Sequence, residues 1–249
     1  MDSTKKIGLG LRHDLAEQFL AERPSSVDFI EIHPENFMKR GGRFGSFLER
    51  AREHYPIATH GLTMCFGSPD PFDNAYLVQL RTFLDDLQAP WHSDHLCFAG
   101  MNGTFLHDLL PLPFNDESLQ LVSERVEQAQ NALGRPLAVE NVSYYAPQTD
   151  HPLDEVDFIV ALLSRTGAKL LLDVNNVYVN SKNFDFDPRA FVDRVRPDDV
   201  VQMHIAGHLI EDKNLRIDTP WRADLRRCVR TIRLYASQDR AKTRLARTR

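Results

Sequence analysis

The chain has 249 residues, of which 42% are hydrophobic and 26% charged, and this suits one globular domain of about the usual size of a (β/α)8 barrel. No apolar run approaches the roughly 18 residues that span a bilayer, no signal peptide is evident, and three scattered cysteines suit a reducing compartment, so we expect a cytoplasmic protein without membrane contact. The net charge is −5, and the first 218 residues, with 20 basic and 33 acidic groups, are too acidic to attract nucleic acid.

Short apolar runs alternate with amphipathic stretches along the chain, a pattern typical of βα units on a parallel sheet. The expected strands are Ile7–Leu11, Phe29–His33, Ile57–Leu62, Trp91–Phe98, Leu137–Val142, Lys169–Val174 and Val200–Ile205. The expected helices are Phe44–His54, Asn74–Leu87, Asp116–Leu133, Leu153–Arg165 and Pro188–Val195. We therefore predict an α/β protein of the TIM (β/α)8 type, formed by residues 1–218, with its eighth strand missing. A doubly wound sheet is less favoured, because no glycine-rich phosphate loop follows the first strand.

Polar side chains gather where the predicted strands end, which is where barrel enzymes carry their chemistry. In chain order they are His33 and Glu35, His60, Asp94 and His95, Glu140 and Asn141, Asp173, Asn175 and Asn176, and His204 and His208; Asp218 follows after a short turn. A single strand-end histidine is more often structural than a ligand. Six consecutive strands that end in His, Asp or Glu instead predict one shared site.

The residue types at this site indicate a metal centre. Several carboxylates in a half-buried site repel one another unless cations neutralise them. Imidazole and carboxylate without thiolate favour Fe, Mn or Zn, and Glu140 or Asp173 is suited to bridge two ions about 3.5–4 Å apart. Cys65 and Cys97 are expected to be core residues rather than nucleophiles.

Five segments also resemble the signatures of a known family: Ile30–Asn36, Ser93–Leu96, Val139–Ser143, Leu172–Asn180 and His204–His208. They are similar to those of the multinuclear non-haem iron-dependent oxidases, formerly a domain of unknown function, which include the methanobactin biosynthesis oxidase. The match runs from about Ile7 to Asp218, and the segment Leu172–Asn180 is especially specific.

The resemblance implies a TIM barrel with two or three iron ions that uses O2 to oxidise cysteine in a ribosomally made peptide, which a separate partner protein delivers. It implies that the metal ligands are His60, His95, Glu140, Asp173, Asn176, His204 and Asp218. Asp94, Asn141, Asn175 and His208 are then expected to orient these ligands or contact substrate. His33 and Glu35 either line the mouth or form a structural pair. No residue is assigned as catalytic.

Two departures from the family pattern stand out. Relatives carry Asn-His-Gly where this chain has Asn183-Phe184-Asp185. Relatives also continue Asp-Thr-His-Gly, in which the His is a ligand, and end in an eighth strand with Glu-Trp-Asp, whereas Asp218-Thr219 is followed here by Pro220-Trp221. Residues 219–249 hold ten Lys/Arg and two Asp, and we hypothesise that a frameshift near Pro220 produced them. A genuine basic extension is the alternative.

Two other functions remain open. One is a hydrolase or isomerase of the endonuclease IV or xylose isomerase type that uses Zn or Mn. The other is a degenerate barrel that binds metal or peptide without turnover, because a ligand histidine and the last-strand Glu are absent.

Overall fold

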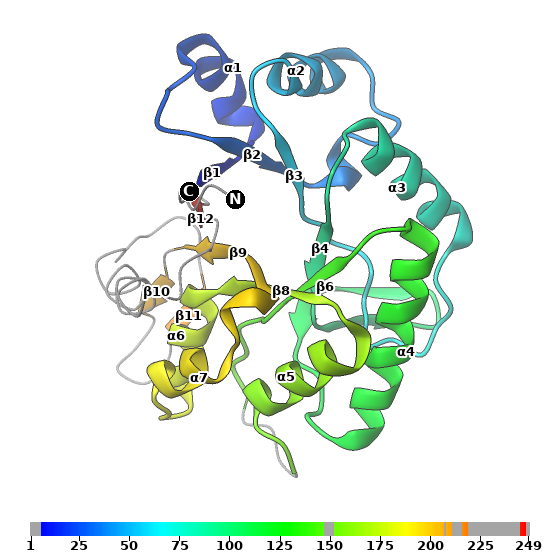
Figure 1. Cartoon of the computed structure of the whole chain (residues 1–249), viewed down its shortest axis with the longest axis vertical. Helices are drawn as coiled ribbons and strands as arrows, with labels where there is room; N and C mark the ends of the chain where they lie inside the picture. Colours follow the sequence, from blue (N-terminus) through cyan, green and yellow to red (C-terminus); the bar gives the residue numbers. More distant parts are fainter. Residues whose placement is uncertain (1–5, 147–151, 207, 211–215, 219–244, 248–249) are drawn as a thin grey trace.

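The structure is a computed structural model, and it describes residues 6–146, 152–206, 208–210, 216–218 and 245–247. Its centre is an eight-stranded sheet in the order β3-β2-β1-β12-β9-β8-β7-β4, in which every strand pair is parallel. Helices lie around the outside of this sheet (Figure 1). The predicted TIM-type α/β fold is confirmed. None of the helices in these ranges is both long and apolar enough to cross a membrane.

The strands of the large sheet are short. They are β1 (Ile7–Gly10), β2 (Phe29–Ile32), β3 (Ile57–Thr59), β4 (His92–His95), β7 (Leu137–Glu140), β8 (Lys169–Asp173), β9 (Val200–Ile205) and β12 (Leu245–Arg247). The helices are α1 (His13–Glu22), α2 (Gly42–Arg52), α3 (Asn74–Asp86), α4 (Asp116–Leu133), α5 (Glu155–Thr166), α6 (Val174–Asn183) and α7 (Pro188–Arg194), with 3-10 turns at Pro34–Asn36 and Pro197–Asp199.

The eighth strand position is occupied, which corrects the expectation that it is missing. Strand β12 lies between β1 and β9 and pairs with both, with Ala246 opposite Gly8 on one side and His204 on the other. Backbone N–H and C=O groups of β1 and β9 need a partner at this place. Three residues from the basic segment after Asp218 supply it. The rest of that segment, including Pro220 and the proposed frameshift, lies outside the described residues.

The two ends of the sheet meet at one point. Strands β3 and β4 are joined by a parallel bridge between His60 and Ser93, and the Gly61 amide donates a 2.6 Å hydrogen bond to the Ser93 carbonyl. This contact brings His60 beside the carboxyl end of β4.

Helix α4 shows how the apolar pattern builds the outer layer. Its inward positions are Leu119, Val122, Val126, Ala129 and Leu133, all at most 1% exposed. Asn115 caps its first turn through a 2.9 Å hydrogen bond from the Ser118 amide. Gly134 ends it in the left-handed region at φ 64°. These inward residues belong to the main core, which also covers β7, β8 and β9.

Two short hairpins stand apart from the large sheet. The first is β5 (Phe98–Met101) with β6 (Thr104–Leu110), and the second is β10 (His208–Ile210) with β11 (Arg216–Asp218). The sequence predicted neither hairpin, and the predicted strand Trp91–Phe98 extended past the end of β4 to the first residue of β5. The second hairpin places Asp218 opposite His208, near the barrel's carboxyl end.

Candidate metal centre

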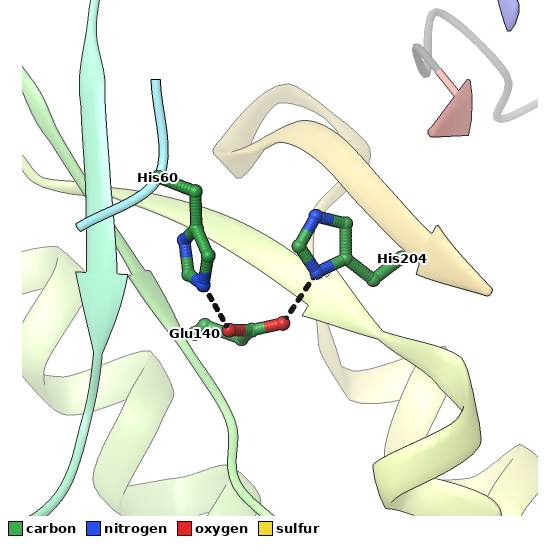
Figure 2. A group of neighbouring side chains, drawn as sticks. All are labelled: His60, Glu140 and His204. Carbon is green, nitrogen blue, oxygen red and sulfur yellow. Dashed lines mark hydrogen bonds and ion pairs between the residues drawn. The ribbon is translucent and has the colours of Figure 1, made fainter. Parts of the chain in front are cut away.

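Glu140 lies at the centre of the predicted site. One of its carboxylate oxygens faces His60 and the other faces His204 (Figure 2). Its Oε2 is 3.0 Å from His60 Nε2 and 3.2 Å from His95 Nε2. Its Oε1 is 2.7 Å from His204 Nδ1. Ligand atoms of His60, Glu140 and His204 all lie within 4.8 Å of one another, and all three side chains are buried.

Four parallel strands deliver these groups to one place. Glu140 ends β7, His95 ends β4, His204 lies near the end of β9, and His60 follows β3 directly. Each strand is buried, so alternate side chains point into the barrel and the last of them meet at its carboxyl end. The His60 ring is further held by a 3.0 Å contact between its Nδ1 and Ser93 Oγ.

Asp173, Asn176 and Asp218 line the same cavity, whose volume is about 310 Å³. Asp173 caps α6 by accepting a 2.7 Å hydrogen bond from the Asn176 amide. Asn141 clamps Asp173 from behind, because its side chain donates to the Asp173 carbonyl at 3.0 Å and accepts from the Asp173 amide at 2.9 Å. All seven predicted ligands, including His95, therefore border one cavity.

The electrostatics of the cavity show an excess of negative charge. Burial raises the pKa of Asp173 well above its usual value, and the charges of Glu140 and Asp218 raise it further. Burial and the charge of Glu140 likewise raise the pKa of Asp218 to about 6. Burial opposes the charge of His204, but Glu31 and Glu140 on its two sides outweigh this and raise its pKa. The cavity thus stabilises added positive charge.

Three features of these residues fit a bound cation. His60 Nε2 and His95 Nε2 are 3.3 Å apart and both face Glu140 Oε2, which is how the ligand atoms of one metal ion are arranged. Glu140 Oε2 is buried, and although His60 Nε2 and His95 Nε2 lie 3.0 and 3.2 Å away, it makes no well-aligned hydrogen bond among the described residues. Asn176 Oδ1 is also buried, and it has no hydrogen-bond partner among the residues that the structure describes. Imidazole, carboxylate and amide oxygen form a donor set suited to Fe, Mn or Zn.

Most of the residues expected to support the ligands do lie behind them. Asp94 accepts from the amides of His95 (2.7 Å), Met64 (3.1 Å) and Thr63 (3.3 Å), and its Oδ1 is 3.5 Å from His95 Nδ1. Gly61 permits this approach, because a Cβ there would overlap the Asp94 carboxylate. Asn175 donates a 2.6 Å hydrogen bond to Asp218 Oδ1.

The other expected residues have different positions. His33 lines the cavity, and its Nδ1 donates a 2.8 Å hydrogen bond to the His60 carbonyl. Glu35 does not line the cavity. It accepts from the Leu62 amide and the Tyr76 hydroxyl, and it borders a neighbouring cavity of about 560 Å³. The His208 side chain lies outside the described part of the structure.

Sequence reasoning missed Glu31 and Gln202. Glu31 on β2 is 3% exposed, and both its oxygens lie within 3.0 Å of His204 Nε2. Gln202 on β9 donates to the same carboxylate. The available signal was a carboxylate two residues before His33 within an apolar strand, on the side of the sheet that faces the barrel interior.

Solved structures share the fold at low sequence identity. An L-ribulose 3-epimerase matches with a TM-score of 0.65 and 14% identity, over 98% of this chain and 81% of that one. A D-psicose 3-epimerase from Clostridium cellulolyticum H10 matches with a TM-score of 0.64 and 13% identity, over 98% and 84%. At these identities the similarity establishes the barrel fold alone.

Relatives found by sequence share a much higher identity with this chain. A UPF0276 protein of Shewanella loihica is 40% identical over 219 residues, which are 88% of this chain and 78% of that protein. A UPF0276 protein of Rhizorhabdus wittichii is 44% identical over 218 residues, or 87% and 78%. The family model described as RiPP precursor modification enzyme MbnB/TglH/ChrH matches residues 6–236. The chain therefore belongs to the MbnB/TglH/ChrH family, which is described as a family of RiPP precursor modification enzymes.

Proposed function

We propose that this protein is a multinuclear iron-dependent oxidase that uses O2 to modify cysteine residues of a ribosomally made peptide. The observation that carries the proposal is the buried group of His60, His95, Glu140 and His204, whose nitrogen and oxygen atoms converge at the carboxyl end of the barrel. Family membership supports a peptide precursor as the substrate.

The donor atoms suggest how the site would divide among ions. Glu140 is suited to bridge two of them, because one oxygen faces His60 and His95 while the other faces His204. Asp173, Asn176 and Asp218, which line the same cavity, would complete the ligand set. Bound iron would supply the redox chemistry that links O2 to a thiolate.

The protein's own cysteines are poor candidates for the thiol that is oxidised. Cys65 and Cys97 are buried, and burial strongly raises the pKa of Cys97, which disfavours its thiolate. Neither borders the metal cavity. Cys228 lies outside the described residues. We propose that the cysteine that is oxidised enters the cavity from a separate peptide. We further propose that a partner protein delivers this peptide, a proposal that rests on the family resemblance alone.

A Zn- or Mn-dependent isomerase or hydrolase is the second candidate, because the same donor types serve those metals and the epimerase structures share the fold. A barrel that binds metal without turnover is the third. Strand β12 places Ala246 opposite His204, so the eighth strand offers no ligating residue at that level.

Oxygen consumption distinguishes the three candidates. The protein, purified anaerobically and loaded with Fe(II), is mixed with a peptide of the family's precursor type and with the same peptide carrying Ser for Cys. We expect O2 uptake and a mass change of the peptide only with cysteine. Sugar epimerisation or phosphodiester cleavage with Zn or Mn would favour the second candidate, and metal binding without any turnover would favour the third.

A further inference from the structure

Glu31 was not predicted as a ligand, yet both of its carboxylate oxygens contact His204, a histidine of the candidate metal centre. Its Oε1 and Oε2 lie 3.0 and 2.9 Å from His204 Nε2. The Gln202 side-chain amide also donates to Oε2, and its Nε2 lies 3.3 Å from His204 Nε2, so the carboxylate is held by two partners.

His204 is held between two carboxylates that use different ring nitrogens. Its Nδ1 faces Glu140 at 2.7 Å, on the side of His60, while its other ring nitrogen points away from Glu140 (Figure 2). A hydrogen bond from Nε2–H to Glu31 selects one tautomer of the neutral ring. In that tautomer the lone pair is on Nδ1, which faces Glu140 and His60.

The neighbouring strands explain why a residue of β2 reaches a residue of β9. Two strands, β1 and β12, lie between them, and they place Gly8 and Ala246 at the level of His204. The ring of Phe29 covers Gly8, since a Cβ on that glycine would overlap it. Glu31 follows Phe29 by two residues and lies on the same face of β2. The small residues Gly8 and Ala246 therefore separate it from His204, and its carboxylate can reach across them.

We propose that Glu31 is a positioning residue that orients His204 as an Nδ1 metal ligand. This role rests on the proposed metal centre. Such hydrogen-bonding partners of metal-bound histidines typically change metal affinity by about 10–100-fold when they are removed. Gln202 supports the same arrangement through its bond to Glu31.

Cobalt(II) titration of the full chain under anaerobic conditions tests this role without measuring activity. Three variants are compared with the wild type: Glu31→Ala, Glu31→Gln, and Glu155→Gln as a control. The control changes a buried carboxyl that borders a different cavity. Metal affinity is measured by competition with a chelator, ligand geometry by the visible absorption of cobalt, and folding by urea unfolding.

We expect Glu31→Ala to weaken cobalt binding by about 10–100-fold and to shift the visible spectrum. Glu31→Gln, whose amide oxygen still accepts from Nε2–H, should recover most of the affinity and the original spectrum, and Glu155→Gln should match the wild type. Equal affinity and spectra in all four proteins would overturn the role of Glu31. So would the loss of one ion per chain in both Glu31 variants, because Glu31 would then be a ligand. If the wild type binds no cobalt, the metal centre itself is overturned and this role with it.

Discussion

Single residues in this protein show two kinds of buried carboxyl group. Glu31 and Glu140 contact imidazoles, and their pKa values are lowered although burial acts in the opposite direction. Among the described residues, the Glu155 carboxyl at the start of α5 accepts only from the Tyr144 hydroxyl at 3.3 Å and the Asn180 side-chain amide at 3.5 Å. Burial therefore raises the pKa of Glu155 to about 8. The first kind is suited to hold a negative charge beside an imidazole, whereas the raised pKa of Glu155 favours its neutral form at pH 7.

The raised pKa of Glu155 makes stability depend on pH. Between the usual value of about 4.5 and about 8, the folded chain holds a proton that the unfolded chain releases, so this residue lowers the free energy of unfolding as pH rises through that range. We expect the free energy of unfolding of Glu155→Gln to fall less over this pH range, so that the variant is more stable than the wild type at pH 8.5. Urea unfolding at pH 5, 7 and 8.5 measures this. A constant difference between the two proteins at all three pH values would contradict it.

The residues proposed as metal ligands were predictable because each is a polar residue at or just after the carboxyl end of a predicted strand. His60, His95, Glu140 and His204 all fall at such places, and parallel strands bring their carboxyl ends together. Glu31 was not assigned, because a strand pattern shows which side of the sheet a residue occupies but not which strand lies across the barrel. Its pairing with His204 spans 173 positions and depends on where β12 lies.

At the scale of elements, two side chains fasten α6 to the segment after β7. Asn176 Nδ2 donates to the Asn141 carbonyl at 3.0 Å, and Asn180 makes two further hydrogen bonds. Asn180 is fully buried, its Oδ1 accepts from the Tyr144 amide at 3.0 Å, and its Nδ2 donates to the Val142 carbonyl at 3.0 Å. The two elements carry Asn176 and Glu140, so the clamp joins two walls of the cavity.

Replacing this clamp should cost stability. Asn180→Ala leaves a buried amide and a buried carbonyl without partners, and we expect the free energy of unfolding to fall by about 2–4 kcal/mol. Asn131→Ala, at an exposed position of α4, is the matched control and should change it by less than about 0.5 kcal/mol. Chemical denaturation compares the two. The clamp is refuted if both variants unfold at the same urea concentration as the wild type.

Helix α6 also shows what the sequence pattern does not reveal. Residues Val174 to Ser181 are all buried, polar and apolar alike, so this stretch has no exposed face and no amphipathic period to recognise. Its first residue follows Asp173 directly, and the pattern therefore extended the strand instead. By contrast, α4 alternates buried and exposed positions and was predicted with its observed bounds.

At the scale of the whole molecule, closure of the barrel depends on a strand of three residues. Each residue of β12 is paired with one residue of β1 and one of β9. Without β12 these two strands would expose unpaired backbone groups to solvent or to another chain. Its pairing with both neighbours means that β12 is an inner strand of the sheet, where proline is not tolerated.

A proline in β12 tests this closure. Ala246→Pro removes an amide hydrogen from the centre of the strand, and we expect a destabilisation on the order of 2 kcal/mol together with increased aggregation. Ala246→Ser keeps the amide and serves as the control. Thermal unfolding and light scattering provide the measurements. Identical curves for the proline and serine variants would show that β12 does not close the sheet.

The metal content of anaerobically purified protein tests the central claim most directly. Wild type, Glu140→Ala and the Glu155→Gln control are analysed by inductively coupled plasma mass spectrometry after reconstitution with Fe(II) and removal of free metal. Because Glu140 contacts His60, His95 and His204 together, we expect at least one tightly bound iron per chain in the wild type and the control, and almost none in Glu140→Ala. A wild type without stoichiometric metal, or a Glu140→Ala variant that retains all of it, would contradict the account.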